Sequence, residues 1–512
     1  MTDNTDNKNS NKLNATPLLL AVFIIAICGI IYELIIGAIS SYLLGDSVKQ
    51  YSITIGLFMS AMGIGSYTTK HFQKNLFDVF ISIELLIGLV GGLSAISLFF
   101  AYGYSEIYHL VMYITIIIIG ILVGLEIPII TRIIESEENN LRLTIANVLS
   151  FDYIGALLGS ILFPIILLPN LGQIRTAFLV GFINILVANL VIYKYKDYIK
   201  NIKLMKVSAF IFALLIIIGF FTGNYTGSII EDNLYRDKII YRQQTKYQKM
   251  IITKHRDDLR MFLNGNIQFS SLDEYRYHEA LVHPAMSLSK NKENILILGG
   301  GDGLAAREIL KYDEVKDIDL VDLDKEVTSF CSNNPLITKL NNNSLNNKKV
   351  NIYNEDAFKY LENSKELFDV IIVDLPDPNN ESLNKLYTNI FYRLIKKHLR
   401  KGGMVSIQST SPYYANEAYW CIRKTVKSEG YFTTGYHLNV PSFGDWGFTL
   451  ASNKDFSKEK IKLKIPTQYL NNEIINSLFT FSKDTKLKKE IEINSLTNPV
   501  LLNYYQKAWN SY

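Results

Sequence analysis

Seven long apolar segments in the first half of the chain constrain its fold more than any other feature of the sequence. They cover residues 16–44, 51–69, 79–101, 107–131, 143–168, 174–193 and 207–223. About 20 apolar residues are enough for a helix to cross a hydrocarbon core of about 30 Å. A soluble helical protein would not repeat such segments with so little charge. The sequence therefore predicts an α-helical membrane bundle of about seven spans.

Charge separates this apolar half from the rest of the 512-residue chain. Asp, Glu, Lys and Arg make up about one residue in ten over residues 16–225 and about one in four over residues 226–512. The net charge of +4, without a dense basic block, gives nucleic acid no footprint, so no nucleic-acid partner is expected. The three cysteines lie far apart and offer neither a disulfide framework nor a zinc-binding spacing.

Four acidic residues fall inside the apolar segments: Glu33, Glu84, Glu126 and Asp152. A lone carboxyl in hydrocarbon costs on the order of 3 kcal/mol by insertion scales, so such residues usually face a partner or a wet cavity. Two interpretations stay open: structural, hydrogen-bonded carboxyls, or an acidic pocket that binds a cation.

Small residues recur in these segments at the spacing of helix-packing motifs. The pairs are Gly88 and Gly92, Gly120 and Gly124, and Gly155 and Gly159. Such pairs let helix backbones approach closely, and they predict tight helix contacts here.

The orientation of the bundle is ambiguous from the distribution of basic residues. With the N-terminus in the cytoplasm, lysines and arginines concentrate on the cytoplasmic side, as the positive-inside rule favours, but seven spans then place residues 226–512 outside. A cytoplasmic second half is nevertheless expected, because the cysteine pattern shows no adaptation to an oxidising space. This placement needs an external N-terminus or one re-entrant segment, for which residues 16–44, broken at Ser40 and Ser41, are the candidate.

The second half begins with a small β-rich unit. Residues 238–254 and 260–269 mix β-branched and aromatic residues with polar ones, and Asn264-Gly265 is a hairpin signal. Residues 275–289 are expected to form a helix. The sequence predicts a small antiparallel β unit before the main domain.

Strands then alternate with helices, which predicts a Rossmann-like, doubly wound parallel sheet. The segment 293–312 reads as a strand, a glycine turn and a helix; further strands are expected in 317–324 and 368–378, with a strand–helix pair over 350–361. The predicted domains are a polar tail at 1–15, a transmembrane helical domain at 16–225, the β unit at 226–275, the Rossmann-like domain at 276–455 and an extension at 456–512, expected to serve packing alone.

The glycine turn after the first strand is a candidate nucleoside site. Its glycines are Gly299, Gly300, Gly301 and Gly303, and Asp322 at the end of the second strand is placed to hold ribose hydroxyls. Asp302 inside the turn would repel a pyrophosphate. A cationic donor without phosphate, carrying a sulfonium or an ammonium, suits this turn better.

A second acidic cluster, Asp374-Leu375-Pro376-Asp377-Pro378, follows an apolar strand. It is expected at the carboxyl edge of the sheet, where such folds bind ligands. Together with Asp302, its carboxylates need a counter-charge. No metal-ligand motif surrounds them, so no metal is expected; a polyamine would neutralise them.

At these residues the sequence resembles the spermidine synthases (polyamine aminopropyltransferases). Tyr247-Gln248, LNGNIQFSSLDEYRYHEALVHPAM, GGGDG, VDLD, NEDAF and DLPDP stand in the order seen in that family, over roughly residues 240–450. Residues 440–448 and the apolar first half resemble its membrane-fused branch. The resemblance implies transfer of an aminopropyl group from decarboxylated S-adenosylmethionine, a co-substrate, to a diamine, usually putrescine. It implies no other cofactor.

The family's functional residues carry over onto matching positions. Asp374 resembles the proton acceptor, and Asp302 the carboxylate that holds the aminopropyl amine. Tyr277, His278 and Asp377 resemble residues of the polyamine pocket. The positions that resemble the adenosine-binding set are Gln248, Gly299, Gly301, Asp322, Asp356 and Ala357. Two departures are Leu304, where soluble members usually have glycine, and Asp322, where they commonly have glutamate.

The resemblance therefore implies a multi-pass protein of the cell membrane with a cytoplasmic catalytic domain. The expected partners are the lipid bilayer, the donor and a diamine, and a homodimer is compatible with the resemblance. Two alternatives stay open. A methyltransferase would have to place the carboxylate of intact S-adenosylmethionine beside Asp302, which is electrostatically unfavourable. A polyamine transporter or sensor would use the acids within the apolar segments.

Overall fold

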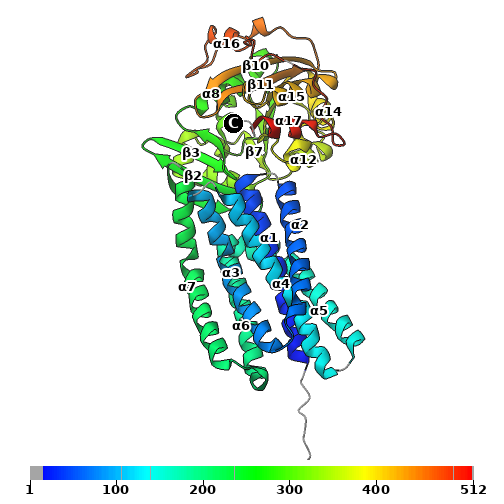
Figure 1. Ribbon diagram of the computed structural model, residues 1–512. Helices are drawn as coiled ribbons and strands as arrows, with labels where there is room; N and C mark the ends of the chain where they lie inside the picture. The colour runs from blue at the N-terminus through cyan, green and yellow to red at the C-terminus, as the bar shows by residue number, and fades with distance from the viewer. Residues whose placement is uncertain are drawn as a thin grey trace, which may run out of the picture. The chain divides into compact units, whose positions relative to one another are not determined.

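The computed structural model describes residues 15–509 except residues 46, 105, 106, 139, 236 and 488. The chain divides into two compact units, Met1–Arg236 and Asp237–Tyr512 (Figure 1). The predicted polar tail lies almost entirely outside the described residues. The finer boundaries expected at residues 225, 275 and 455 stay predictions.

Most residues of each predicted apolar segment lie in a long helix of the first unit. The helices are α1 Thr16–Leu44, α2 Ser47–Thr68, α3 Leu76–Tyr104, α4 Tyr108–Glu138, α5 Leu141–Leu162, α6 Leu168–Lys194 and α7 Ile202–Leu234. A short π-helical segment, Phe163–Leu167, joins α5 to α6. Within α6, Gly172 adopts φ 70° and ψ −178°, a conformation that glycine tolerates best and that kinks the helix.

By length and composition, five runs among the described residues are apolar enough to cross a membrane. They are Thr16–Leu44, Leu76–Gly103, Tyr108–Ser136, Leu141–Lys194 and Ile202–Gly223. α2 is not among them, since serine, threonine and lysine interrupt its apolar residues. α5 and α6 form one run of 54 residues. The predicted number of about seven spans is therefore not confirmed.

The re-entrant segment suggested for residues 16–44 is wrong, because α1 is one continuous helix of 29 residues. Ser40 does not break it. Its hydroxyl is buried and lies 3.0 Å from the Tyr108 hydroxyl, so the polar group is satisfied between two helices.

The predicted glycine pairs lie where helices touch. A Cβ atom at Gly124 in α4 would come within 2.1 Å of the Met62 carbonyl oxygen in α2, and one at Gly88 in α3 within 2.7 Å of the Gly181 carbonyl oxygen in α6. Any larger residue at these positions would push the helices apart, so the glycines set the packing of these two helix pairs.

Two of the four acids within the helices meet in the core of the bundle. Glu84 and Glu126 are buried and hydrogen-bonded to each other. Asn184 in α6 donates from Nδ2 to Glu84 Oε2 at 3.1 Å. A hydrogen bond between two carboxyl groups requires a shared proton, which supports the structural interpretation for this pair.

The second unit begins with the predicted antiparallel β unit. Its four strands, in the spatial order β1-β2-β3-β4, are Lys238–Gln244, Lys249–His255, Asp258–Leu263 and Asn266–Ser270. Asn264 and Gly265 both have positive φ, 49° and 81°, and join β3 to β4 in the predicted two-residue hairpin. The helix expected at 275–289 is α8, Glu274–Leu288.

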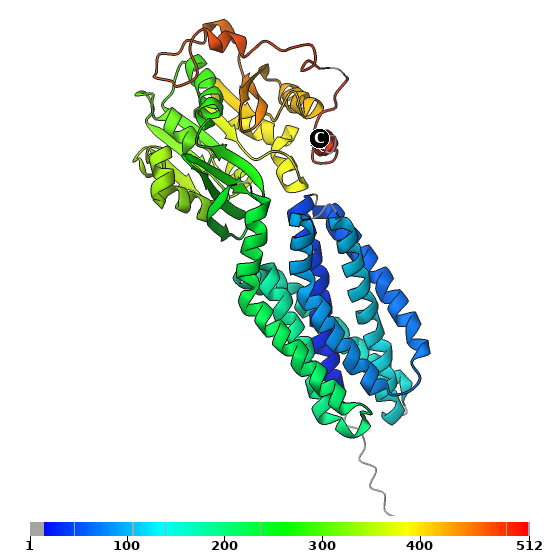
Figure 2. The same ribbon diagram turned by 60° about the vertical axis from the view of Figure 1, so that its left-hand side comes forward.

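A seven-stranded sheet forms the centre of this unit, in the order β10-β11-β9-β8-β5-β6-β7 (Figures 1 and 2). Its strands are β5 Asn294–Gly299, β6 Asp317–Val321, β7 Val350–Tyr353, β8 Phe368–Asp374, β9 Leu399–Gln408, β10 Phe432–Val440 and β11 Gly444–Ser452. β5 to β9 are parallel, whereas β11 pairs antiparallel with β9 and β10 with β11. The Rossmann-like prediction is confirmed.

Helices cover both faces of this sheet, since alternate residues of its strands enter two separate cores. Along β5, Ile295 and Ile297 pack in the core that contains residues of α8. Leu296 and Leu298 pack in the other core, with residues of α14, Asn389–His398, and α15, Asn416–Ser428. A central strand buried on both faces leaves only its carboxyl end open for polar side chains.

Candidate active site

The glycine turn and the second acidic cluster meet at the carboxyl edge of the sheet. β5 pairs with β8 so that Gly299 lies opposite Asp374. Gly299 has a φ of 88°, and a Cβ atom there would lie 2.0 Å from the Asp374 carbonyl oxygen. Only glycine fits this approach. The turn therefore starts directly beside the strand end that carries Asp374.

Asp374 is partly buried and accepts a hydrogen bond from the Tyr277 hydroxyl, with 2.6 Å between the oxygen atoms. Burial raises the pKa of its carboxyl, the charge of His278 lowers it and the neighbouring Asp302 raises it, and the combined effect is a pKa of about 6. A carboxylate with this pKa is ionised at neutral pH and is a stronger base than an ordinary aspartate.

Asp302 lies in the turn, where its Oδ1 accepts from the Leu304 backbone amide at 2.8 Å. Burial raises the pKa of Asp302, while the charge of His278 lowers it. Both carboxyls therefore lie within electrostatic range of the same histidine.

His278 is held by a charged chain that the sequence analysis did not include. Its Nδ1 lies 2.8 Å from both the carbonyl oxygen and Oε2 of Glu274, four residues earlier on α8. Arg307 in turn donates to both oxygens of the Glu274 carboxylate, at 2.7 and 3.0 Å. Burial lowers the pKa of His278, but Glu274 and the two aspartates outweigh it and raise the pKa to about 9. His278 is therefore a cation that offsets part of the acidic charge.

Three side chains donate hydrogen bonds to Asp377. Gln408 Nε2 donates to its Oδ1 at 3.0 Å, and the Thr410 hydroxyl donates to its Oδ2 at 3.1 Å. The hydroxyl of Tyr505, from the C-terminal helix, also donates to this carboxylate. A residue of the C-terminal extension, 456–512, therefore contacts the acidic cluster, whereas the expectation that this extension carries no chemistry stays a prediction.

The residues proposed for the nucleoside lie along the neighbouring strand ends. The backbone amides of Gly301 and Asp324 donate to the two oxygens of Asp322 at 3.1 and 2.9 Å. Burial raises the pKa of Asp322 to about 6. Gln248 Nε2 donates to Asp324 Oδ2 at 3.0 Å. Gln248 and Asp322 are thus brought to one strand end through Asp324.

Asp356 and Ala357 stand at the start of α12, Ala357–Asn363. The Asp356 carboxylate caps this helix by accepting from the Phe358 amide at 2.9 Å, and its other oxygen pairs with Lys385.

Several residues of the site escaped the sequence analysis: Glu274, Arg307, Gln408, Thr410 and Tyr505. Glu274 had a readable signal, because an acid four residues before a histidine on one helix lies next to it. Tyr505 had none, since 128 residues separate it from Asp377 and no motif links them.

Among the described residues, no group of three or more His, Cys, Asp and Glu side chains is arranged to hold a metal ion. The acidic cluster instead offers three separately held carboxylates and one cationic histidine. Such an arrangement suits an organic cation with more than one charged centre, and Asp374 can accept a proton from it.

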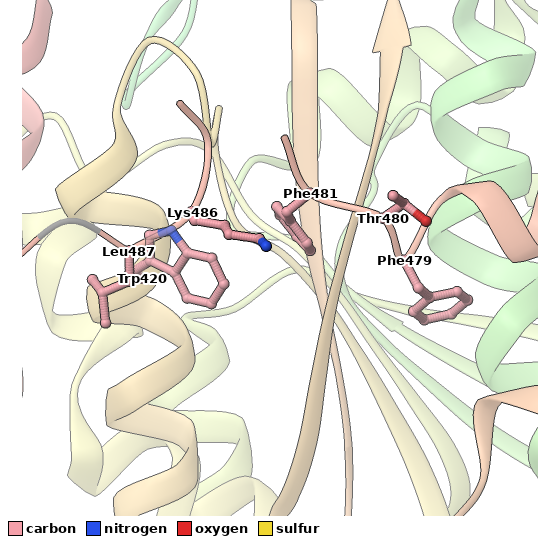
Figure 3. Close-up of a pocket in the computed structure, with 6 residues that line it drawn as sticks. All are labelled: Trp420, Phe479, Thr480, Phe481, Lys486 and Leu487. Atoms are coloured by element: carbon pink, nitrogen blue, oxygen red, sulfur yellow. The ribbon is translucent and has the colours of Figure 1, made fainter. Parts of the chain in front are cut away.

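A hollow of about 580 Å³ lies elsewhere on this unit, lined by Trp420, Phe479, Thr480, Phe481, Lys486 and Leu487 (Figure 3). Segment 478–481 runs beside the edge strand β10, where the His437 amide donates to the Leu478 carbonyl. The hollow contains no acidic side chain, so it does not share the chemistry of the site at β5 and β8.

Comparison with known proteins gives consistent matches. Residues 274–464 match the model of the spermine/spermidine synthase domain. A polyamine aminopropyltransferase of Leptospira interrogans is 44% identical over 501 residues, covering 97% of this chain and 99% of that protein. One from Oceanobacillus iheyensis is 42% identical over 496 residues, covering 96% of each. The crystal structure of spermidine synthase from Thermotoga maritima matches 48% of this chain and 85% of its own, with 25% identity and a TM-score of 0.44.

Proposed function

The chain belongs to the polyamine aminopropyltransferase family of enzymes, and on that premise we propose that it transfers an aminopropyl group from decarboxylated S-adenosylmethionine to putrescine. The products are spermidine and methylthioadenosine. The observation that carries the proposal is that Asp302 and Asp374, at the carboxyl ends of β5 and β8, both lie within electrostatic range of the cationic His278.

The reaction needs little covalent chemistry from the protein. The attacking ammonium gives up one proton, its nitrogen lone pair attacks the carbon beside the sulfonium, and the C–S bond breaks with its electrons moving to sulfur, which leaves a secondary ammonium and a neutral thioether. An alkylamine has a pKa of about 10.4, like lysine, so it is protonated and not nucleophilic at neutral pH. Asp374, with a raised pKa of about 6, is the group we assign to accept the proton.

Asp302 is assigned to the ammonium of the donor. A decarboxylated donor presents an ammonium, and no carboxylate, to this side chain. Intact S-adenosylmethionine would add a carboxylate, which makes methyl transfer the less favourable alternative. The remaining donor contacts are assigned to the strand-end residues Gln248, Gly299, Gly301, Asp322, Asp356 and Ala357.

The diamine is assigned to the side of Tyr277, His278 and Asp377. Tyr277 donates to Asp374 and holds its Oδ1, so the other oxygen is left for the attacking amine. Holding both cations in line contributes much of the rate, because it converts an encounter of two molecules into a step within one complex.

The test is release of methylthioadenosine by the purified full chain with decarboxylated donor and putrescine. The proposal requires release that depends on the diamine, with intact S-adenosylmethionine inactive under the same conditions. Methyl transfer from intact donor would favour the methyltransferase. Binding of polyamine without turnover of either donor would favour the transporter or sensor.

We also propose that the helical unit lies in the cell membrane and that the catalytic unit faces the cytoplasm. The five long apolar runs support membrane insertion. Cytosolic supply of the donor supports the orientation, although basic residues between the helices favour the opposite one. Reporter fusions after residue 225, one active only in the cytoplasm and one only outside, test it; an external signal would reverse the placement.

A further inference from the structure

The C-terminal helix α17, Val500–Trp509, is built into the catalytic unit rather than attached to its surface. Val500 and Leu501 are buried in the same core as strand β8, and Tyr504, Tyr505 and Ala508 pack against that core. The helix contacts α15 and also α13, Glu381–Asn384, which follows the acidic cluster in the chain. Its position is therefore fixed by apolar burial.

Asn494 ties the start of α17 to the loop behind the acidic cluster. This side chain is fully buried; its Nδ2 donates to the Tyr387 carbonyl at 3.1 Å and its Oδ1 accepts from the Leu501 amide at 3.3 Å. The Tyr387 hydroxyl donates to the Pro376 carbonyl at 3.0 Å. The helix and the segment that carries Asp377 are thus held by one connected set of hydrogen bonds.

The end of α17 is held by aromatic contacts. The rings of Trp509 and Tyr414 are stacked, with centroids 5.8 Å apart. A Cβ atom at Gly444 would meet the Tyr414 ring at 2.8 Å, and the neighbouring Phe443 packs edge-to-face on Tyr277 at 5.7 Å. These contacts connect α17 to the loop that covers the Tyr277 side of the site.

Between these two attachments, Tyr505 places its hydroxyl on Asp377. An ionised carboxylate has about four lone-pair positions. Gln408, Thr410 and Tyr505 occupy three of them, which leaves one for an ammonium. Tyr505 also packs against the apolar core that contains Leu375, two residues before Asp377.

We propose that Tyr505 closes the far end of the amine pocket at Asp377 and restricts the acceptor to short diamines. This inference rests on the proposed function for the assignment of Asp377 to the amine side. Tyr505 acts through Asp377 and through its own bulk, so it is a positioning and specificity residue rather than a catalytic one.

The test compares Tyr505→Phe and Tyr505→Ala by calorimetric binding of putrescine and of a triamine, spermidine, to the full chain saturated with methylthioadenosine. Tyr505→Phe should weaken putrescine binding about tenfold, because Asp377 loses one charge-assisted hydrogen bond. It should keep the preference for the diamine, since the ring remains. Tyr505→Ala should raise the triamine's affinity relative to putrescine about tenfold or more.

The matched control is Tyr504→Phe, together with Tyr504→Ala. Tyr504 is the preceding residue of the same helix, and its hydroxyl accepts from the Glu492 backbone amide at 3.5 Å. Unchanged amine binding in both Tyr505 variants would overturn the inference, as would an equal change of selectivity in Tyr504→Ala. Absence of amine binding to the wild-type chain would also overturn it. Selective diamine binding without turnover would uphold it and refute the proposed function instead.

Where turnover is detected, the same variants separate the kinetic constants. A residue that acts on acceptor binding changes the KM for the amine and leaves kcat within about twofold. A fall in kcat with unchanged KM would assign Tyr505 to the chemical step and overturn the specificity role.

Discussion

Replacement of Asp374 by asparagine isolates the proton transfer from the binding interactions of the same side chain. Asparagine keeps the size of aspartate, and its amide oxygen can still accept from the Tyr277 hydroxyl, so the hydrogen bond at 2.6 Å has a replacement partner. The variant should fold normally. What it loses is a group that can take a proton and one negative charge beside His278.

The magnitude follows from the state of Asp374. With a pKa of about 6, about nine-tenths of the wild-type molecules carry the ionised carboxylate at pH 7. The wild type is thus nearly fully competent there, and the variant has no competent fraction. Loss of a positioned general base lowers the rate about 10²–10⁴-fold, or about 3–5 kcal/mol of transition-state stabilisation.

The assay is methylthioadenosine release under saturating donor and amine, so that kcat is measured rather than binding. Glu381→Gln is the matched control. It removes one negative charge from the exposed side of the loop that follows the acidic cluster, and it should leave kcat within about twofold, since surface substitutions have small effects. A folded Asp374→Asn enzyme with kcat within threefold of wild type, as a rough limit, would refute the assignment of the proton acceptor.

Three further predictions concern other groups of the catalytic unit. Asp302→Asn should weaken binding of the decarboxylated donor about tenfold or more, measured by calorimetry, because it removes the partner of the donor ammonium. Methylthioadenosine lacks that ammonium and should bind nearly as before. Equal losses of affinity for both ligands would make Asp302 structural. Because protonated Asp374 cannot accept a proton, kcat/KM should fall as pH drops below about 6, and kcat should fall only at lower pH, since bound cations favour the ionised form; a flat profile from pH 7 to about 5 would contradict this. Glu308→Gln should lower the free energy of unfolding by about 3 kcal/mol at pH 7. Burial raises the pKa of Glu308, but the interactions with His283, Arg307 and Lys311 outweigh burial and lower the pKa to about 2, so the folded state favours the ionised carboxylate. That stabilisation is present above the unfolded-state pKa and is lost as pH falls from about 4.5 to about 2, so the unfolding free energies of wild type and variant should converge over this range. Unfolding can be followed by tryptophan fluorescence, because all three tryptophans lie in residues 237–512.

The local order of the chain could be predicted wherever one short segment determines it. The Asn264-Gly265 hairpin, the strand–glycine turn–helix at 294–309 and the helix that carries Tyr277 and His278 all depend on residues close in sequence. The meeting of Asp302 with Asp374 also followed from topology, because parallel strands bring their carboxyl ends to one edge.

The contacts that support the site were harder to predict, since they join distant segments. Arg307 reaches Glu274 across 33 residues, and Tyr505 reaches Asp377 from a helix with no motif. The predicted number of spans was not confirmed for another reason. Hydropathy alone did not distinguish α2, which is rich in hydroxyl side chains, from the more apolar helices. It also did not indicate that α5 and α6 form one continuous apolar run.

The central claim is that the acidic cluster transfers an aminopropyl group to an amine, and product identification tests it most directly. The purified full chain is incubated with putrescine and a decarboxylated donor whose aminopropyl group carries a heavy-isotope label, and the amines are analysed by mass spectrometry. The account predicts a labelled triamine that contains the whole aminopropyl group, formed in equal amount to methylthioadenosine and absent with Asp374→Asn. A methylated amine, or donor breakdown without any labelled amine product, would contradict it.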